Sequence, residues 1–192
     1  MSYIQVKREL MSGKIYITGT RGGLGSAIMR KLTLTFPYQD IIELNRPEHD
    51  LSRVDGNLDS LVKDDFSIYV NCSHYEFSQV ELLYRLFDHN KDRKCHIINI
   101  GSVSSDGDRK AINPYAIQKA ALEKACQQLS LISDKCKVSL VKPGRMNTKM
   151  VEHIDAPKMD PASVAESLNW IATQPEHINI KSLTIDIMQD LK

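Results

Sequence analysis

A tyrosine and a lysine, Tyr115 and Lys119, stand four residues apart in a stretch that predicts a helix over residues 114–131. This spacing puts both side chains on one face of a helix, a turn apart. A free phenol has a pKa near 10, about three units too high for a base at neutral pH. An ammonium about 4 Å away contributes on the order of 4 kcal/mol at an effective dielectric constant of about 20, which is enough to close that gap. The pair therefore indicates proton-transfer chemistry, and the alternative is a solvated surface of an amphipathic helix.

A glycine-rich loop is suited to bind phosphates. The sequence ITGTRGGLG, residues 17–25, runs from a strand-like segment through a loop into a predicted helix. Gly19 permits a tight turn, and Gly23 and Gly25 let backbone or ligand approach closely. The helix that starts near Leu24 offers free N–H groups and its positive dipole end to a pyrophosphate. A plain glycine turn is the alternative, but the order strand, loop, helix favours dinucleotide binding.

The elements that must position these residues alternate along the chain. Strands are predicted over residues 14–18, 40–44, 67–72, 95–102 and 182–188, with a further strand that ends at residue 141. Helices are predicted over residues 24–36, 57–63, 76–88, 114–131 and 161–173. Alternating strands and helices indicate a parallel sheet that is covered on both faces. We expect one doubly wound α/β (Rossmann) domain over residues 1–192, with about six strands and a reduced edge, and a loose N-terminal extension over residues 1–12.

Composition excludes several classes of function. Lys and Arg number 25 and Asp and Glu 24, so the net charge of +1 argues against a broad surface for nucleic acid or for an anionic membrane. The four cysteines form no CxxC pair, and the six histidines are scattered, so no metal site is predicted. No apolar run approaches the length of a membrane span. The expected compartment is the reducing cytoplasm.

With the elements placed, the sequence resembles the short-chain dehydrogenase/reductase family over most of its length. The matching positions are the T-G-x-x-x-G-x-G loop at residues 18–25, Asn71, Ser102, Tyr115, Lys119, Pro143, Gly144 and Thr148. Each lies at the expected end of its strand or helix, and Ser102 precedes Tyr115 by the customary 13 residues. The agreement of four motifs in the right order carries the resemblance, because Tyr-x-x-x-Lys alone occurs readily by chance.

The resemblance implies a role for each matched residue. Tyr115 would be the acid and base, Lys119 would lower its pKa and hold the nicotinamide ribose, and Ser102 would stabilise the substrate oxygen. The implied cofactor-binding residues are Gly19, Arg21, Gly23, Leu24, Gly25, Arg46, Asp50, Leu51, Asn71, Cys72, Ser73, Tyr115, Lys119, Pro143, Gly144 and Thr148. The substrate pocket would be lined by His74, Tyr75, Arg145, Met146 and His153.

The loop arginine and the residues after the second strand indicate which nicotinamide is used. In this family an acid at that strand end holds the ribose diol of NAD, whereas this chain has Asn45 and Arg46 there and Arg21 in the glycine loop. Glu43 comes too early and is expected to face along the strand. Two arginines without a well-placed carboxylate favour the 2′-phosphate of NADP, with NAD as the alternative.

Departures from the family pattern keep other functions open. The family's usual asparagine, in the helix before the catalytic serine, has no counterpart, and the lid after Thr148 is a stub. The leading hypothesis is an enzyme that moves hydride between NADP(H) and a carbonyl or secondary alcohol. The alternatives are a catalytically idle dinucleotide-binding or redox-sensing module and a sugar-nucleotide reductase or epimerase.

Self-association is expected from the resemblance, as a homodimer or homotetramer. In this family the helices before and after the catalytic strand often build a dimer. Here they carry Val80, Leu83, Leu86, Phe87, Ile117, Ala121, Leu122 and Leu129, which would equally suit an ordinary core.

Overall fold

A six-stranded parallel sheet forms the centre of the protein. The computed structural model describes residues 13–37, 39–52, 62, 65–107 and 112–188. The strands are β1 (Ile15–Thr18), β2 (Ile41–Leu44), β3 (Ile68–Asn71), β4 (Cys95–Ile100), β5 (Cys136–Pro143) and β6 (Ser182–Ile185). Their order in the sheet is β2-β1-β3-β4-β5-β6, and every neighbouring pair is parallel. The predicted doubly wound α/β fold is confirmed.

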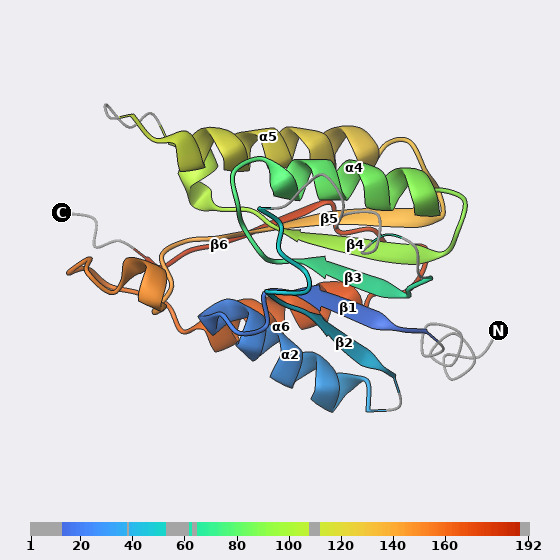
Figure 1. Ribbon diagram of the computed structural model, residues 1–192, viewed down its shortest axis with the longest axis horizontal. Helices are drawn as coiled ribbons and strands as arrows, with labels where there is room; N and C mark the ends of the chain where they lie inside the picture. The colour runs from blue at the N-terminus through green and yellow to red at the C-terminus, as the bar shows by residue number, and fades with distance from the viewer. Residues whose placement is uncertain (1–12, 38, 53–61, 63–64, 108–111, 189–192) are drawn as a thin grey trace.

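Helices cover both faces of the sheet. They are α2 (Gly23–Thr35), α4 (Ser78–Asn90), α5 (Pro114–Leu129) and α6 (Pro161–Ala172), with two short 3-10 helices, η1 (Val103–Asp106) and η2 (Lys149–Val151). Figure 1 shows α4 and α5 side by side on one face and α2 and α6 together on the other. Two cores result, because alternate residues of each buried strand point to opposite faces. Ile15 and Ile17 pack toward α2 and α6, whereas Tyr16 packs toward α4 and α5.

Most predicted elements occur within a few residues of their expected bounds. The strand that was predicted to end at residue 141 is longer and runs to Pro143. The predicted helix over residues 57–63 falls almost wholly outside the described residues, and so does the N-terminal extension over residues 1–12. The apolar residues considered for a dimer interface differ in their exposure. Ile117 is 65% exposed, whereas the core buries Leu83, Leu86, Phe87, Leu122 and Leu129.

The site must lie at the carboxyl ends of β1 and β3. The chain leaves β1 to form β2 on one side and later returns to form β3 on the other side. The strand order therefore reverses between β1 and β3, and ligands of open α/β sheets bind in the crevice at such a point. The glycine loop follows β1, and the segment that begins at Cys72 follows β3. No helix among the described ranges is long and apolar enough to cross a membrane.

Candidate functional site

The glycine loop leaves the start of α2 free of side-chain caps. Gly19 has a φ of +74°, a backbone conformation that glycine adopts without strain. A Cβ at Gly25 would overlap the carbonyl oxygen of Gly19, so this close crossing of loop and helix requires glycine. Gly22 is the N-cap of α2, and it has no side chain to cap the N–H groups of the first turn. Its free N–H groups and positive dipole end fit a phosphate.

Thr18 joins the glycine loop to the end of β3. Its hydroxyl accepts hydrogen bonds from the backbone N–H groups of Cys72 (2.8 Å) and Ser73 (2.9 Å). Ser73 lies against Gly19, where a Cβ on the glycine would come within 2.5 Å of the serine hydroxyl. The predicted Gly19, Cys72 and Ser73 are therefore brought together at the switch point of the sheet.

Ser102, Tyr115 and Lys119 converge beside this point. Ser102 follows β4 and is the N-cap of η1, while α5 begins at Pro114 and carries Tyr115 and Lys119. Asn113 caps α5 by accepting from the N–H of Ala116 (3.2 Å), which fixes the first turn and with it Tyr115. The Lys119 ammonium lies 5.5 Å from the centre of the Tyr115 ring. The three predicted catalytic side chains thus lie near one another and near Cys72, which follows β3.

The pKa of Tyr115 differs from the prediction. Burial raises the pKa of the phenol, whereas its hydrogen bond with Ser102 lowers it and the Cys72 thiol raises it, with a net rise. The sequence argument expected Lys119 to lower this pKa toward neutrality. The ammonium instead donates to Gln79 Oε1 (2.6 Å) and to the Ile100 carbonyl (2.8 Å). The Tyr115 hydroxyl consequently keeps its proton at neutral pH.

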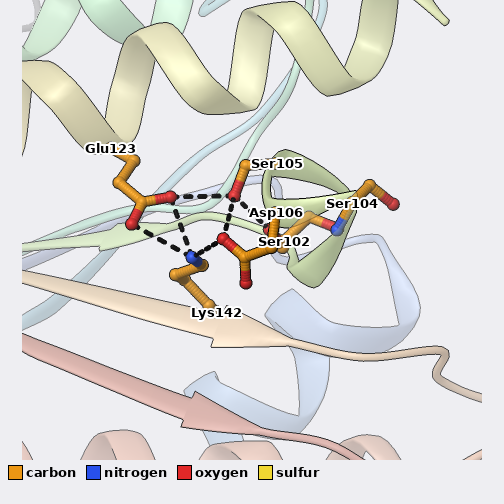
Figure 2. A network of polar contacts seen from close by, with 6 residues as sticks. All are labelled: Ser102, Ser104, Ser105, Asp106, Glu123 and Lys142. Atoms are coloured by element: carbon orange, nitrogen blue, oxygen red, sulfur yellow. Dashed lines mark hydrogen bonds and ion pairs between the residues drawn. The ribbon is translucent and has the colours of Figure 1, made fainter. Parts of the chain in front are cut away.

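A partly buried polar network around Lys142 connects η1 to α5 and β5 (Figure 2). Lys142, on β5, has a side chain that is only 6% exposed, and it forms ion pairs with Asp106 and with Glu123 (2.8 Å). The Ser105 hydroxyl lies 2.8 Å from both the Ser102 carbonyl and Glu123 Oε2. The Ser104 N–H donates to Ser102 Oγ (3.1 Å). The network ties the segment after β4 to α5 and β5, so it fixes the backbone that carries Ser102.

The opposite end of the crevice carries the two arginines. Arg21 Nη1 donates to the Arg46 carbonyl (2.8 Å), and both residues are exposed. Glu43 was predicted to face along the strand, and this is wrong, because its carboxylate accepts from the Thr20 hydroxyl and from Asn45 Nδ2 (3.4 Å). A carboxylate therefore does stand at this strand end, although loop and strand-end side chains already bind it.

Only some of the predicted substrate-pocket residues lie close to Tyr115. His74 lies edge-on to the Tyr115 ring, with ring centres 4.9 Å apart, and burial and Lys119 lower its pKa. Tyr75, next along the chain, is exposed. Met146 instead packs against the core beside α2 and α6, and His153 is exposed on the segment after η2. No contact recorded among the described residues joins Arg145 to Tyr115.

The remaining predicted cofactor residues are placed as follows. Thr148 lies against Gly23, where a Cβ on the glycine would come within 3.0 Å of Thr148 Cγ2. Asn71 is fully buried and Leu24 packs in the core. Leu51 is also buried in the core, on the α4 and α5 side, and Asp50 accepts from the N–H of Ser52 (3.0 Å). Pro143 ends β5 and Gly144 follows it, and the Gly144 N–H donates to the Ile185 carbonyl (2.8 Å).

Sequence comparison finds oxidoreductases. No protein-family model matches the chain. An uncharacterized oxidoreductase of Staphylococcus epidermidis is 27% identical over 217 aligned residues, which cover 88% of this chain and 94% of that protein.

Structure comparison finds the same fold in dehydrogenases and reductases. A 3-ketoacyl-(acyl-carrier-protein) reductase from Brucella melitensis, complexed with NADH, matches with a TM-score of 0.76 at 16% identity, covering 92% of this chain and 98% of that chain. An alcohol dehydrogenase from Thermococcus sibiricus, complexed with 5-hydroxy-NADP, matches with a TM-score of 0.69 at 14% identity and covers 90% and 95%. An oxidoreductase of the short-chain dehydrogenase/reductase family from Burkholderia thailandensis matches with a TM-score of 0.71 at 15% identity, covering 90% of each chain.

The chain shares the fold of short-chain dehydrogenases/reductases and is similar in sequence to an uncharacterized oxidoreductase. The sequence comparison supports the prediction of an oxidoreductase, and the structure comparison supports the predicted fold. The uncapped start of α2, the close crossing at Gly25 and the converging side chains of Ser102, Tyr115 and Lys119 fit a dinucleotide of the kind that the Brucella and Thermococcus structures contain.

Gln79 is a residue beside Lys119 that the sequence did not reveal. The sequence has no counterpart of the family's asparagine in the helix before the catalytic serine. The structure puts the amide of Gln79, from the first turn of α4, against the Lys119 ammonium instead. No motif marks this glutamine, because its approach depends on how α4 packs against α5. Helical spacing could have suggested Glu123, which follows Tyr115 and Lys119 at intervals of four residues on the same face of α5.

Proposed function

We propose that this protein transfers hydride between NADP(H) and a carbonyl or secondary alcohol. The observation that carries the proposal is the convergence of Ser102, Tyr115 and Lys119 beside a glycine loop whose helix start is uncapped. A dinucleotide on the loop would extend from the two arginines toward Tyr115. When bound, the reduced nicotinamide supplies hydride to the carbonyl carbon of the substrate.

Tyr115 is suited to the role of proton donor in the reductive direction. Burial raises its pKa, so at neutral pH the hydroxyl carries the proton that the substrate oxygen needs when the alcohol forms. Ser102 bonds to the same hydroxyl and can donate to the substrate oxygen as negative charge develops there. The Lys119 ammonium, 5.5 Å from the ring centre, stabilises the phenolate that remains. His74 restricts the Tyr115 ring from its edge.

Two groups support NADP(H) as the cofactor. Arg21 and Arg46 are exposed and adjacent at the far end of the crevice, where a 2′-phosphate would be met by guanidinium groups. The Glu43 carboxylate, which could otherwise bond to a ribose diol, is bound by Thr20 and Asn45. NAD(H) is the alternative that the affinity measurements below distinguish.

A panel of aldehydes, ketones and secondary alcohols tests the enzyme activity. We expect oxidation of NADPH, followed at its absorbance band, with at least one carbonyl class. The Tyr115→Phe variant should lose roughly 10²- to 10⁴-fold in kcat, because it lacks the proton donor. Its NADPH affinity should stay close to that of the unmodified protein. Activity that survives this substitution would overturn the assigned role of Tyr115.

A second candidate is a dinucleotide-binding module without turnover. It is favoured by the short segment between Thr148 and α6, which leaves little chain to cover a substrate. This segment is held at its base, where the N–H of Asn147 donates to the Met159 carbonyl and the N–H of Met159 donates to the Arg145 carbonyl. Tight NADPH binding with no turnover on the whole panel would select the module.

A further inference from the structure

The Lys119 ammonium is buried and held by two neutral oxygens. The residue is 3% exposed, and its Nζ donates to Gln79 Oε1 on α4 at 2.6 Å and to the Ile100 carbonyl at the end of β4 at 2.8 Å. An ammonium has three donors, and two of them are fixed by these bonds. No carboxylate of the described residues forms an ion pair with Lys119.

The orientation of the Gln79 amide is set by its other contacts. Gln79 is 2% exposed, and its Nε2 donates to the Asn71 carbonyl at 2.9 Å. Asn71 Nδ2 donates in return to the Gln79 carbonyl at 3.0 Å and to Asn99 Oδ1 at 3.0 Å. Exchanging the nitrogen and oxygen of the amide would place its NH2 group against the ammonium and its oxygen against the Asn71 carbonyl oxygen. Oε1 therefore faces Lys119, and the buried chain from Asn99 through Asn71 keeps it there.

A neutral acceptor has a different effect from a carboxylate at this place. The titratable groups that face Lys119 are the Cys72 thiol after β3, His74 in the next loop and Tyr115 on its own helix. Glu123, one turn further along α5, bonds to Lys142 and Ser105. Burial lowers the pKa of Lys119 to about 8, and the Cys72 thiol raises it. A carboxylate at position 79 would stabilise the charged form of the Lys119 amine. An amide oxygen orients the amine by a hydrogen bond, and its protonation then depends on burial and on the neighbouring titratable groups.

We propose that Gln79 is a positioning residue, whose amide oxygen holds the Lys119 ammonium beside the Tyr115 ring and within reach of a bound dinucleotide while leaving it without a counter-charge. The consequence for chemistry rests on the function proposed above, because it assumes that Lys119 contacts the cofactor. The positioning itself is a property of the protein alone and can be measured without cofactor.

The test is a pH titration of Lys119 followed by NMR on protein that carries ¹³Cε-labelled lysine, with the resonance assigned from its absence in Lys119→Met. The variants are Gln79→Glu, which keeps the shape and adds a charge, and Gln79→Met, which keeps the length and removes the acceptor. Gln127→Glu, on the exposed surface of α5 two turns beyond Lys119, is the matched control for charge. Backbone amide spectra verify that each variant is folded.

The two substitutions should move the titration in opposite directions. Gln79→Glu should raise the Lys119 midpoint by about one pH unit or more, because an opposite charge then lies within hydrogen-bond distance. Gln79→Met should lower it, and Gln127→Glu should leave it in place. A structural role alone would not produce opposite displacements. An unchanged midpoint in Gln79→Glu, or equal displacement by the control, overturns the proposal, and Gln79→Glu decides it even if Gln79→Met does not fold.

NADPH affinity, measured by fluorescence with the same proteins, separates this inference from the proposed function. If the midpoint moves as expected and NADPH binding follows it with pH, both are supported. If the midpoint moves while NADPH does not bind to any of the proteins, Gln79 positions Lys119 as proposed and the proposed function fails.

Discussion

The two ends of the crevice use different cations in different ways. At the Tyr115 end, Lys119 and Lys142 are buried, and each is held by bonds from two other elements. At the far end, Arg21 and Arg46 are exposed, and the Arg21 guanidinium donates to the backbone carbonyl of Arg46. The buried end is built into the fold, so changes there should alter stability and geometry. Changes at the exposed end should alter only the affinity for the ligand.

The largest effect is expected from the charge on Lys119. Burial lowers its pKa from 10.5 to about 8, so between these pH values the unfolded chain binds a proton that the folded chain does not. The free energy of unfolding should therefore rise with pH across this window, and below pH 8 the protein carries the full cost of about 3 kcal/mol. Urea unfolding of the unmodified protein and Lys119→Met, from pH 7 to pH 11, measures this difference.

The control for that series is Lys124→Met, which removes an exposed lysine from the same helix. Its unfolding free energies should run parallel to those of the unmodified protein at every pH. If the unfolding free energies of Lys119→Met also run parallel to those of the unmodified protein, the ammonium is not desolvated in the folded state. The contrast between a buried and an exposed cation at the two ends of the crevice would then be wrong.

The second effect concerns the network around Lys142. Lys142→Met leaves Asp106 and Glu123 without their cation beneath Ser102, and unfolding should become easier by about 2 kcal/mol, as for other lost charged hydrogen bonds. Chemical denaturation at neutral pH measures the change. The kcat for a carbonyl substrate should also fall, because the segment that carries Ser102 is no longer tied to β5.

A double-mutant cycle with Glu123→Gln tests whether this loss comes from the ion pair. The two substitutions should be non-additive by about 1 kcal/mol, since each removes the same interaction. Additive effects would mean that Lys142 stabilises the fold only through its aliphatic stem.

The sequence predicted which side chains gather at the candidate site better than it predicted the bonds that hold them. Ser102, Tyr115 and Lys119 could be found because their spacing within and between elements is fixed by helix geometry and by strand ends. Gln79 and Lys119 are 40 residues apart and meet only because α4 packs against α5. The same holds for Lys142, which reaches Glu123 from a neighbouring strand.

Two errors have a common physical source. The pKa of Tyr115 was predicted from one charge at a plausible distance, whereas burial is the largest influence on it in the folded protein. The prediction for Glu43 considered only its place in the strand. A side chain near the end of a strand can reach the adjacent loop, and there the Thr20 hydroxyl donates to the Glu43 carboxylate. Burial and loop contacts depend on tertiary packing, which a single sequence reports only indirectly.

The smallest effect is expected at the arginine end. Arg46→Ser should weaken NADPH binding about tenfold, or about 1.4 kcal/mol, because an exposed guanidinium contributes modestly to a phosphate contact. NADH affinity should be unchanged, since NADH lacks the 2′-phosphate, and the unfolding free energy should stay within about 0.5 kcal/mol. Fluorescence titrations with both coenzymes measure this, with Arg30→Ser on the exposed side of α2 as the control. The tenfold difference should shrink as salt is added, because exposed charges are screened. Equal weakening for NADH and NADPH would mean that Arg46 contacts a part of the dinucleotide common to both, and the preference for NADP(H) would lose its support.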